Sequence, residues 1–175
     1  MDCFSLKCNQ MKNQNPASKI WSYDQITTKV NEIKSQGKSI VFTNGCFDII
    51  HAGHVKYLAE TAELADFLIV AVNSDASVKR MEKSPARPLQ NEFSRSHVMA
   101  SFAFVDAVII FTEDTPKEII EIITPHVLVK GGDYTVENIV GADWVMQHGG
   151  QVKTIEFLPG YSTSAIEKKI LQSHS

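Results

Sequence analysis

Five short apolar runs, separated by amphipathic segments of helical length, constrain the fold of this 175-residue chain more than any other feature. Most of the runs are apolar on both faces, as are strands of a parallel sheet covered on each side. The alternation predicts a single doubly wound α/β domain, Rossmann-like, with a five-stranded parallel sheet. The predicted strands span 39–44, 67–73, 107–111, 127–130 and 152–157. The predicted helices span 53–65, 92–104, 116–123, 138–148 and 163–171, and one further helix precedes the first strand and ends at Gly37.

The composition fits one globular domain that acts on small molecules. The chain is 43% hydrophobic and carries a net charge of -3, with acidic and basic residues mixed along it. No basic stripe is available to attract nucleic acid or an anionic membrane, so we expect neither as a partner. We expect residues 1–18 to form a flexible tail and residues 19–175 to form the domain.

Cysteine usage and hydropathy indicate a cytoplasmic protein. Cys3, Cys8 and Cys46 form no CxxC pair, which is typical of reduced thiols. The first 18 residues contain no apolar run of signal-peptide length, and no segment approaches the roughly 20 apolar residues of a membrane span. We therefore expect a cytoplasmic chain without a membrane segment.

In a doubly wound sheet the ligand lies beyond the carboxyl ends of the strands. The segments that follow the predicted strands are therefore expected to form the site. They span 44–54, 73–91, 130–137 and 158–164.

The segment "TNGCFDIIHAGH", residues 43–54, joins the first of these strands to a helix. A helix N-terminus presents unpaired N–H groups and the positive end of the helix dipole, so it binds anions, and phosphate is the obvious candidate. Gly45 permits a tight turn, and Gly53 lets the backbone approach a ligand closely. His51 and His54 can both donate ring N–H bonds to phosphate oxygens.

Other interpretations of this segment are open. The patterns GxxxxGK[ST] and GxGxxG are missing, which disfavours a P-loop and a dinucleotide site. Zinc needs a third ligand, and the two histidines are at i and i+3 rather than the i and i+4 of HExxH. For an isolated HxGH motif, two histidines that cap a helix and face water are the stronger interpretation.

Motifs elsewhere change that weighting, because the chain resembles the cytidylyltransferase-like nucleotidyltransferase superfamily. "HAGH" stands where that superfamily has its HxGH element, and "GYSTSAI" at 160–166 matches its late Ser/Thr cluster. The likeness narrows to the heptose 1-phosphate adenylyltransferases through "VAVNSDASVKR", "RP", "FVDAVIIFTEDTP", "VLVKGGDYTVENIVGAD" and "LPGYSTSAI". It covers about residues 38–171.

The resemblance implies a reaction, a cofactor and partners. A sugar 1-phosphate oxygen attacks the α-phosphorus of ATP, releasing pyrophosphate and forming ADP-heptose for lipopolysaccharide or other surface glycans. Magnesium accompanies ATP, and no metal site on the protein itself is expected. A separate heptose kinase supplies the sugar phosphate, because the kinase half of the bifunctional relatives is not in this sequence. We expect a homodimer, for which the apolar segment 98–105 offers surface, although core packing explains that segment equally well.

The resemblance also assigns roles to residues. The expected catalytic residues are His51, His54, Lys83 and Arg95. The expected nucleotide-binding residues are Thr43, Asn44, Gly45, Cys46, Phe47, Gly53, Lys130, Gly131, Gly132, Asp133, Ser162, Thr163 and Ser164. The expected substrate-binding residues are Asp48, Lys79, Arg80 and Tyr134.

Several of these residues have plainer interpretations. One of the three hydroxyls at 162–164 can be an ordinary helix cap. Lys79, Arg80 and Lys83 can be a solvated charge run, and Arg95 a surface residue of its helix. Asp48 is better explained as structural support. Cys46 has apolar neighbours that favour a buried thiol, so it is not expected to act as a nucleophile.

Two other functions remain open. One is a cytidylyltransferase for another small phosphate such as glycerol 3-phosphate, which is disfavoured because no arginine closely precedes the Ser/Thr cluster. The other is a nucleotide-binding sensor that has lost turnover.

Overall fold

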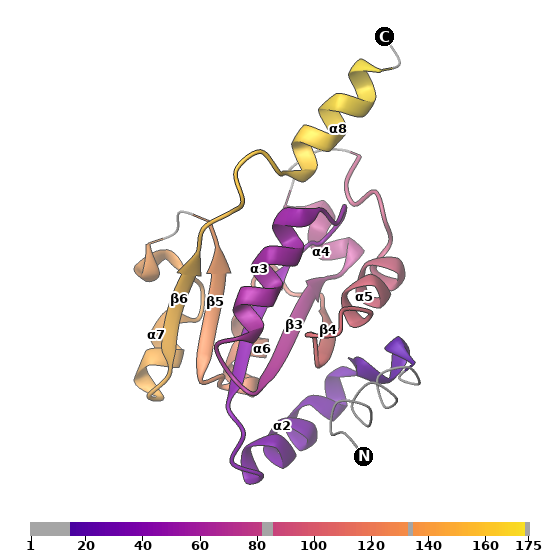
Figure 1. Cartoon of the computed structure of the whole chain (residues 1–175). Helices are drawn as coiled ribbons and strands as arrows, with labels where there is room; N and C mark the ends of the chain where they lie inside the picture. The colour runs from indigo at the N-terminus through magenta and orange to yellow at the C-terminus, as the bar shows by residue number, and fades with distance from the viewer. Residues whose placement is uncertain (1–14, 82–85, 133–134, 174–175) are drawn as a thin grey trace, which may run out of the picture.

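A six-stranded, entirely parallel sheet forms the centre of the computed structural model, which describes residues 15–81, 86–132 and 135–173 (Figure 1). Its strands lie in the order β1-β4-β3-β2-β5-β6. They are β1 (Ile20–Trp21), β2 (Ile40–Gly45), β3 (Phe67–Asn73), β4 (Ala107–Phe111), β5 (Val127–Gly131) and β6 (Gln151–Ile155). The predicted α/β class and parallel sheet are confirmed, but the count of five strands is wrong. The additional strand, β1, has only two residues and pairs with β4, so its sequence carries no detectable alternation.

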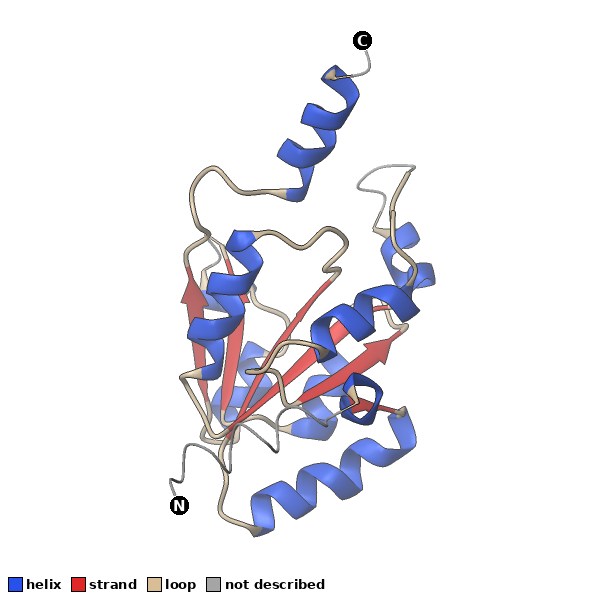
Figure 2. Ribbon diagram, turned by 45° about the vertical axis from the view of Figure 1, so that its right-hand side comes forward, coloured by secondary structure: helices blue, strands red, loops and turns tan. Residues whose placement is uncertain are grey.

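The predicted helices are present, with three differences (Figure 2). Asp75–Arg80, expected as irregular chain, forms a short helix, and the single helix expected over 138–148 is interrupted. Residues 16–18, expected in the tail, belong to a 3-10 helix capped by Asn15, whereas residues 1–14 lie outside the described part of the chain. The helices are α2 (Ile26–Ser35), α3 (Ala52–Ala62), α4 (Asp75–Arg80), α5 (Glu92–Ala100), α6 (Lys117–Ile123), α7 (Ala142–Gln147) and α8 (Thr163–Gln172), with 3-10 helices η1 (Pro16–Lys19), η2 (Tyr23–Gln25) and η3 (Val136–Asn138).

Alternate side chains of the central strands point to opposite faces of the sheet and build two cores. On one face Val41, Val70 and Val108 pack against α3 and α5. On the other face Phe42 and Ile69 pack against α2, α6 and α7. Each face is therefore covered by helices, which explains why these strands read as continuous apolar runs.

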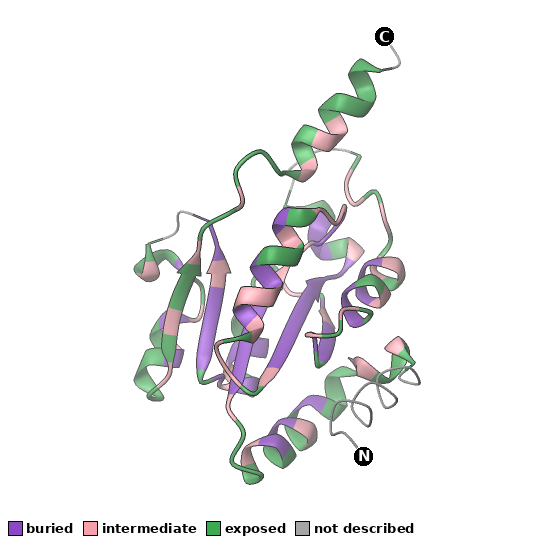
Figure 3. Cartoon of the chain, viewed as in Figure 1, coloured by how far each residue is buried: buried purple, intermediate pink, exposed green. Residues whose placement is uncertain are grey.

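Burial is uneven at the edges of the molecule (Figure 3). The edge strand β6 has no buried residue, and α8 projects from the body with none of its ten residues buried. The segment at 98–105 is mixed, because Met99, Ala100 and Val105 are in the core and Val98 is exposed. Core packing thus accounts for part of that segment, and the homodimer stays a prediction. No helix in the described ranges has the length and apolar character to span a membrane.

The strand order places a switch point beside β2. From β2 the chain proceeds to β3 and β4 on one side and then returns to β5 and β6 on the other. Loops leaving β2 and β5 diverge there, which opens a crevice at the carboxyl ends of the strands. The segment that carries the two histidines leaves β2 at this point.

Candidate active site

A buried arginine, Arg95, supports the turn that follows β2 at Cys46. Arg95 on α5 is fully buried, and its guanidinium donates to the carbonyl oxygens of Cys46 at 2.7 Å and Gln90 at 2.9 Å and to the Asp75 carboxylate at 2.8 Å. The interpretation of Arg95 as a surface residue is wrong. Its three contacts are all within the protein, so in this structure it supports the turn and does not line the cavity beside it.

Asp48 fixes the other side of the same turn. Its two carboxylate oxygens accept from the backbone N–H groups of Leu89 and Gln90, each at 2.9 Å, and Gln90 Nε2 donates to the Asp48 carbonyl at 2.7 Å. The side chain is buried. This geometry agrees with the preferred interpretation of Asp48 as structural support.

Phe47 gives the turn its shape. Its φ angle is 50°, in the left-handed region that non-glycine residues rarely adopt, so the tight turn is made there and not at Gly45 as expected. Gly45 instead leaves room for the Phe47 ring, since a Cβ at this position would lie 3.1 Å from it. Strained backbone of this kind is found mainly at functional sites.

The two histidines lie together at the start of α3, with ring centroids 3.9 Å apart. His51 occupies the cap position, yet its side chain makes no capping hydrogen bond. The Nδ1 atoms of His51 and His54 are buried and have no partner among the described residues. These two observations disfavour the interpretation as water-facing caps, because buried polar atoms without partners are costly unless a ligand satisfies them.

Burial keeps both imidazoles neutral. It lowers the pKa of His51, and it lowers the pKa of His54 to about 4, with a smaller contribution from the nearby charge of His51. A phosphate group beside them would favour the protonated forms and raise both pKa values.

The low His54 pKa predicts how stability depends on pH. An unfolded histidine titrates near 6.5, so between pH 6.5 and 4 the unfolded chain binds this proton and the folded chain does not. The contribution of His54 to the free energy of unfolding is therefore complete above pH 6.5 and is lost as the pH falls through 4. In urea titrations from pH 7 to 4.5, His54→Asn should lose less free energy of unfolding than wild type. Equal losses would contradict the assigned pKa.

The lack of a side chain at Gly53 leaves room for the His51 ring. A Cβ at residue 53 would lie 3.0 Å from His51 Nδ1 and 3.3 Å from the Tyr161 Cβ atom. We expect Gly53→Ala to displace the His51 ring and lower kcat/KM about tenfold, because a small misplacement of a phosphate-binding group is costly. The melting temperature should change little, since alanine favours a helix. Steady-state kinetics and thermal melting of the two proteins check this, and unaltered kinetics would contradict it.

A cavity of about 320 Å³ opens beside His54, and we call it the histidine cavity. A second cavity of about 180 Å³, the adjoining cavity, shares Asn44, Gly45, Cys46 and Lys130 with it. The histidine cavity is lined by Asn44, Gly45, Cys46, Phe47, Asp48, His54, Tyr57, Val78, Arg87, Lys130, Gly131, Phe157 and Thr163. The adjoining cavity is lined by Asn44, Gly45, Cys46, Asn73, Met81, Asp114, Thr115, Pro116, Lys130 and Val140.

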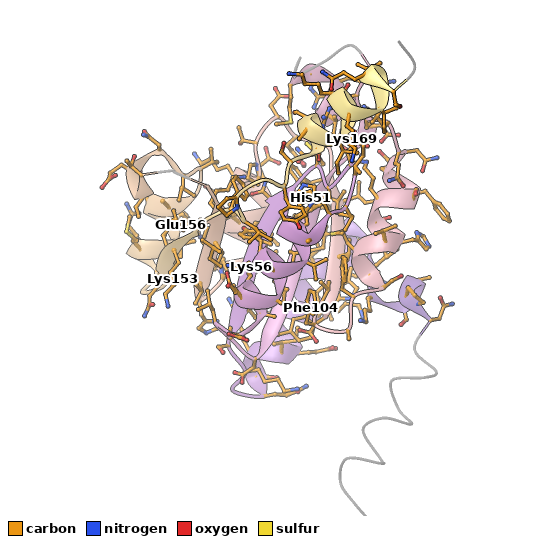
Figure 4. All side chains as sticks on the ribbon, turned by 45° about the horizontal axis from the view of Figure 1, so that its top comes forward. His51, Lys56, Phe104, Lys153, Glu156 and Lys169 are labelled. Carbon is orange, nitrogen blue, oxygen red and sulfur yellow. The ribbon has the colours of Figure 1, made fainter. Side chains whose placement is uncertain are left out.

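The start of α8 lies against the histidine turn, although the two are more than 100 residues apart in sequence. Thr163 Oγ1 donates to the Ile49 carbonyl at 3.4 Å, and the Tyr161 ring centroid is 6.4 Å from that of His51. Ser162 caps the helix by accepting from the Ala165 N–H at 3.1 Å, and Ser164 is exposed. Figure 4 shows His51 below α8, which carries Lys169. The predicted closeness of "HAGH" and "YSTSA" is confirmed.

The two glycines at the end of β5 face an aromatic ring. A Cβ at Gly131 would lie 2.6 Å from Phe157, and one at Gly132, whose φ is 105°, would lie 2.8 Å from it. These glycines therefore let Phe157 lie against the backbone, where a ligand was expected. The Phe157 ring remains 58% exposed, so one aromatic surface is available to the histidine cavity.

Other expected site residues are placed differently. Thr43 is buried, its hydroxyl is 2.6 Å from that of Tyr57, and neither cavity wall includes it, so its nucleotide contact stays a prediction. Cys46 is half-buried and lines both cavities, so the expectation of a buried thiol is also wrong. Neither cavity wall includes Lys79 or Arg80, which are exposed on α4, although Arg80 forms an ion pair with Asp114. Lys83, Asp133 and Tyr134 lie outside the described residues.

Sequence reasoning missed several residues that line the cavities, among them Tyr57, Arg87, Asp114 and Phe157. Arg87 belongs to the "RP" pair that carried part of the resemblance, and Asp114 follows β4, whose carboxyl end was not included among the expected segments. The rule that ligands lie beyond the strand ends could have identified Asp114.

A larger cavity of about 580 Å³ lies between α6, η3 and α7, away from the histidines. Its charged lining includes Glu121, Glu137 and Asp143 beside Lys117. This excess of carboxylates disfavours phosphate binding, whereas the smaller histidine cavity combines the cations Arg87 and Lys130, the His54 imidazole and the start of α8. The chemistry therefore favours the histidine cavity as the site.

The fold and this site match a known family. The cytidylyltransferase-like family matches residues 42–169, and the chain belongs to it. Among individual proteins, the chain is 48% identical over 158 residues to the bifunctional protein HldE of Pelobacter propionicus and 52% identical over 150 residues to that of Marinomonas sp.. These matches cover 90% and 86% of the chain but only 32% and 31% of the relatives. The chain thus spans about a third of their length.

Solved structures show the same fold. The lipopolysaccharide core biosynthesis protein from Thermoplasma volcanium matches with a TM-score of 0.57 and 27% identity, over 70% of this chain and 98% of that protein. A pantoate-beta-alanine ligase from Francisella tularensis matches with a TM-score of 0.52 at 13% identity, over 87% of this chain and 77% of that one. The second likeness concerns the fold alone.

Proposed function

We propose that this chain transfers AMP from ATP to a heptose 1-phosphate, forming ADP-heptose and pyrophosphate for surface-glycan synthesis. The observation that carries the proposal is the pair of half-buried histidines whose buried Nδ1 atoms have no partner among the described residues, with His54 and Thr163 of α8 lining one cavity. Anion-binding groups thus come from two helix starts at the switch point of the sheet. The HldE relatives and the lipopolysaccharide core biosynthesis protein support the substrate class.

The chemistry suits a site of hydrogen-bond donors. The sugar phosphate is already an anion, so its oxygen attacks the α-phosphorus without a strong general base, and the bond to pyrophosphate breaks. His51 and His54 bind the triphosphate, and the hydroxyls at 162–164 bind its β and γ groups from the opposite side. Catalysis then comes from alignment and from stabilising the charge that develops on the phosphates.

Each of the two substrates occupies one of the two cavities in this proposal. ATP occupies the histidine cavity, with its base near the exposed surface of Phe157. The sugar occupies the adjoining cavity, where Asn73 and Asp114 offer amide and carboxylate groups to its hydroxyls. Lys130 lines both cavities. In this proposal its cation contacts the phosphates of both substrates. A sugar kinase reaction has to supply the acceptor.

Magnesium enters with ATP in this proposal. Among the residues that the structure describes, no group of three or more histidine, cysteine or acidic side chains is gathered to hold a metal. Magnesium prefers phosphate oxygens and water over an all-protein cage, so the donors present fit an ion carried by the triphosphate. Bound there, it neutralises charge on the leaving pyrophosphate.

Pyrophosphate release tests the proposal. The protein is incubated with ATP, magnesium and either anomer of D-glycero-D-manno-heptose 1-phosphate, and with CTP in place of ATP. We expect release with ATP and one heptose anomer, and at least tenfold less with CTP. Activity with CTP and glycerol 3-phosphate would instead support a cytidylyltransferase. Nucleotide binding without turnover on a panel of sugar phosphates would support a sensor.

A further inference from the structure

Arg87 lies where α8 meets the histidine turn. One guanidinium nitrogen is 2.9 Å from a Glu167 carboxylate oxygen on α8, and the other is 4.0 Å from Asp48. The Arg87 side chain is 14% exposed, and it lines the histidine cavity together with His54 and Thr163. Its position between two carboxylates is not explained by the reaction described above.

The attachment of α8 depends on few contacts. None of its residues, from Thr163 to Gln172, is buried, so hydrophobic packing contributes little. The Thr163 hydrogen bond to Ile49 is long, at 3.4 Å. The ion pair of Arg87 with Glu167 is shorter and largely shielded from water, which makes it stronger than an exposed pair.

The other end of this connection is rigid. Asp48 is anchored by the backbone of Leu89 and Gln90, and its side chain is 2% exposed. Asp48, Arg87 and Glu167 therefore form a chain of charges from the histidine turn to α8. An arginine suits the middle position because one nitrogen of its planar fork donates to Glu167 while the other lies within ion-pair distance of Asp48.

We propose that Arg87 is a positioning residue that seats α8 against the histidine turn through Glu167. The inference rests on the proposed function, because the seated helix is what brings the hydroxyls at 162–164 to the β and γ phosphates of ATP. Arg87 acts through α8 and does not contact the phosphates itself. Loss of either Arg87 or Glu167 should therefore weaken the binding of ATP but not that of the sugar phosphate.

A double-mutant cycle tests this role. Arg87→Gln, Glu167→Gln and the double variant are assayed for ATP affinity by calorimetry and for KM of both substrates. Each single variant should weaken ATP binding about tenfold, while KM for the sugar phosphate stays within about threefold. The double variant should bind ATP no more weakly than the single variant with the lower ATP affinity, because both changes break the same contact. Lys168→Gln, an exposed neighbour on α8, is the matched control and should resemble wild type.

Hydrogen exchange gives a readout that does not depend on turnover. Amides of α8 should exchange several-fold faster in both single variants than in wild type or Lys168→Gln. Unchanged exchange would overturn the proposal. The proposal would also be overturned if Arg87→Gln weakened ATP binding and Glu167→Gln did not, because Arg87 would then contact phosphate directly. If wild type binds ATP but turns over no acceptor, the proposed function fails, while exchange and calorimetry still decide the role of Arg87.

Discussion

His54→Ala is expected to lower kcat about 10²- to 10³-fold, the usual loss when one preorganised donor to a developing charge is removed. The free energy of unfolding should change by about 1 kcal/mol or less, because the ring is half-buried and its Nδ1 atom has no partner to lose. Pyrophosphate release and urea unfolding measure the two quantities. The variant thus separates a group held for the ligand from one held for the fold.

A histidine elsewhere provides the control for this result. His148 is exposed at the end of α7, so His148→Ala should keep both kcat and stability. A fall in the melting temperature of His54→Ala by about 10 °C, with activity recovered at low temperature, would mark His54 as structural. That outcome would remove the main observation behind the proposed function.

Arg95→Met is expected to destabilise the chain by about 3 kcal/mol or more. The change removes three hydrogen bonds and leaves the Asp75 carboxylate and two carbonyl groups without their donor. For a chain of this size the melting temperature should fall by roughly 10 °C. Activity should fall as well, because the Cys46 turn loses its support. Thermal and urea unfolding measure the effect.

Arg80→Met is the matched control for stability. Its ion pair with Asp114 is exposed, so its loss should cost about 1 kcal/mol or less. If Arg95→Met instead keeps wild-type stability and loses only activity, Arg95 contacts a substrate, as its predicted catalytic role required. The support role rests on the full burial of Arg95 and on the three hydrogen bonds of its guanidinium to the turn and to Asp75.

The alternation of apolar runs and helices was sufficient to predict the parallel sheet, because both faces of its central strands are buried and leave a clear pattern. It was insufficient at the edges. The two-residue β1 is too short for any periodicity, and the six-residue α4 is too short to show an apolar face. Edge elements are specified by tertiary contacts, which a local pattern does not record.

The site followed a similar rule. "HAGH" and "YSTSA" were placed correctly relative to each other because the strand order brings their loops to the same edge of the sheet. The burial of Arg95 and its support of the turn could not be predicted, because an arginine in sequence does not reveal which carbonyls it meets. Arg87 and Phe157 were missed for the same reason, since their importance comes from Glu167 and from the two glycines at the end of β5.

Phosphorus NMR of one reaction mixture tests the central claim most directly. The full chain is mixed with ATP, magnesium and heptose 1-phosphate, and the products are followed without a coupling enzyme. We predict that the sugar phosphate resonance is replaced by two coupled diphosphate signals, and that pyrophosphate appears in equal amount. A sugar phosphate resonance that stays constant for both anomers, with or without ATP hydrolysis, would contradict adenylyl transfer to a heptose 1-phosphate.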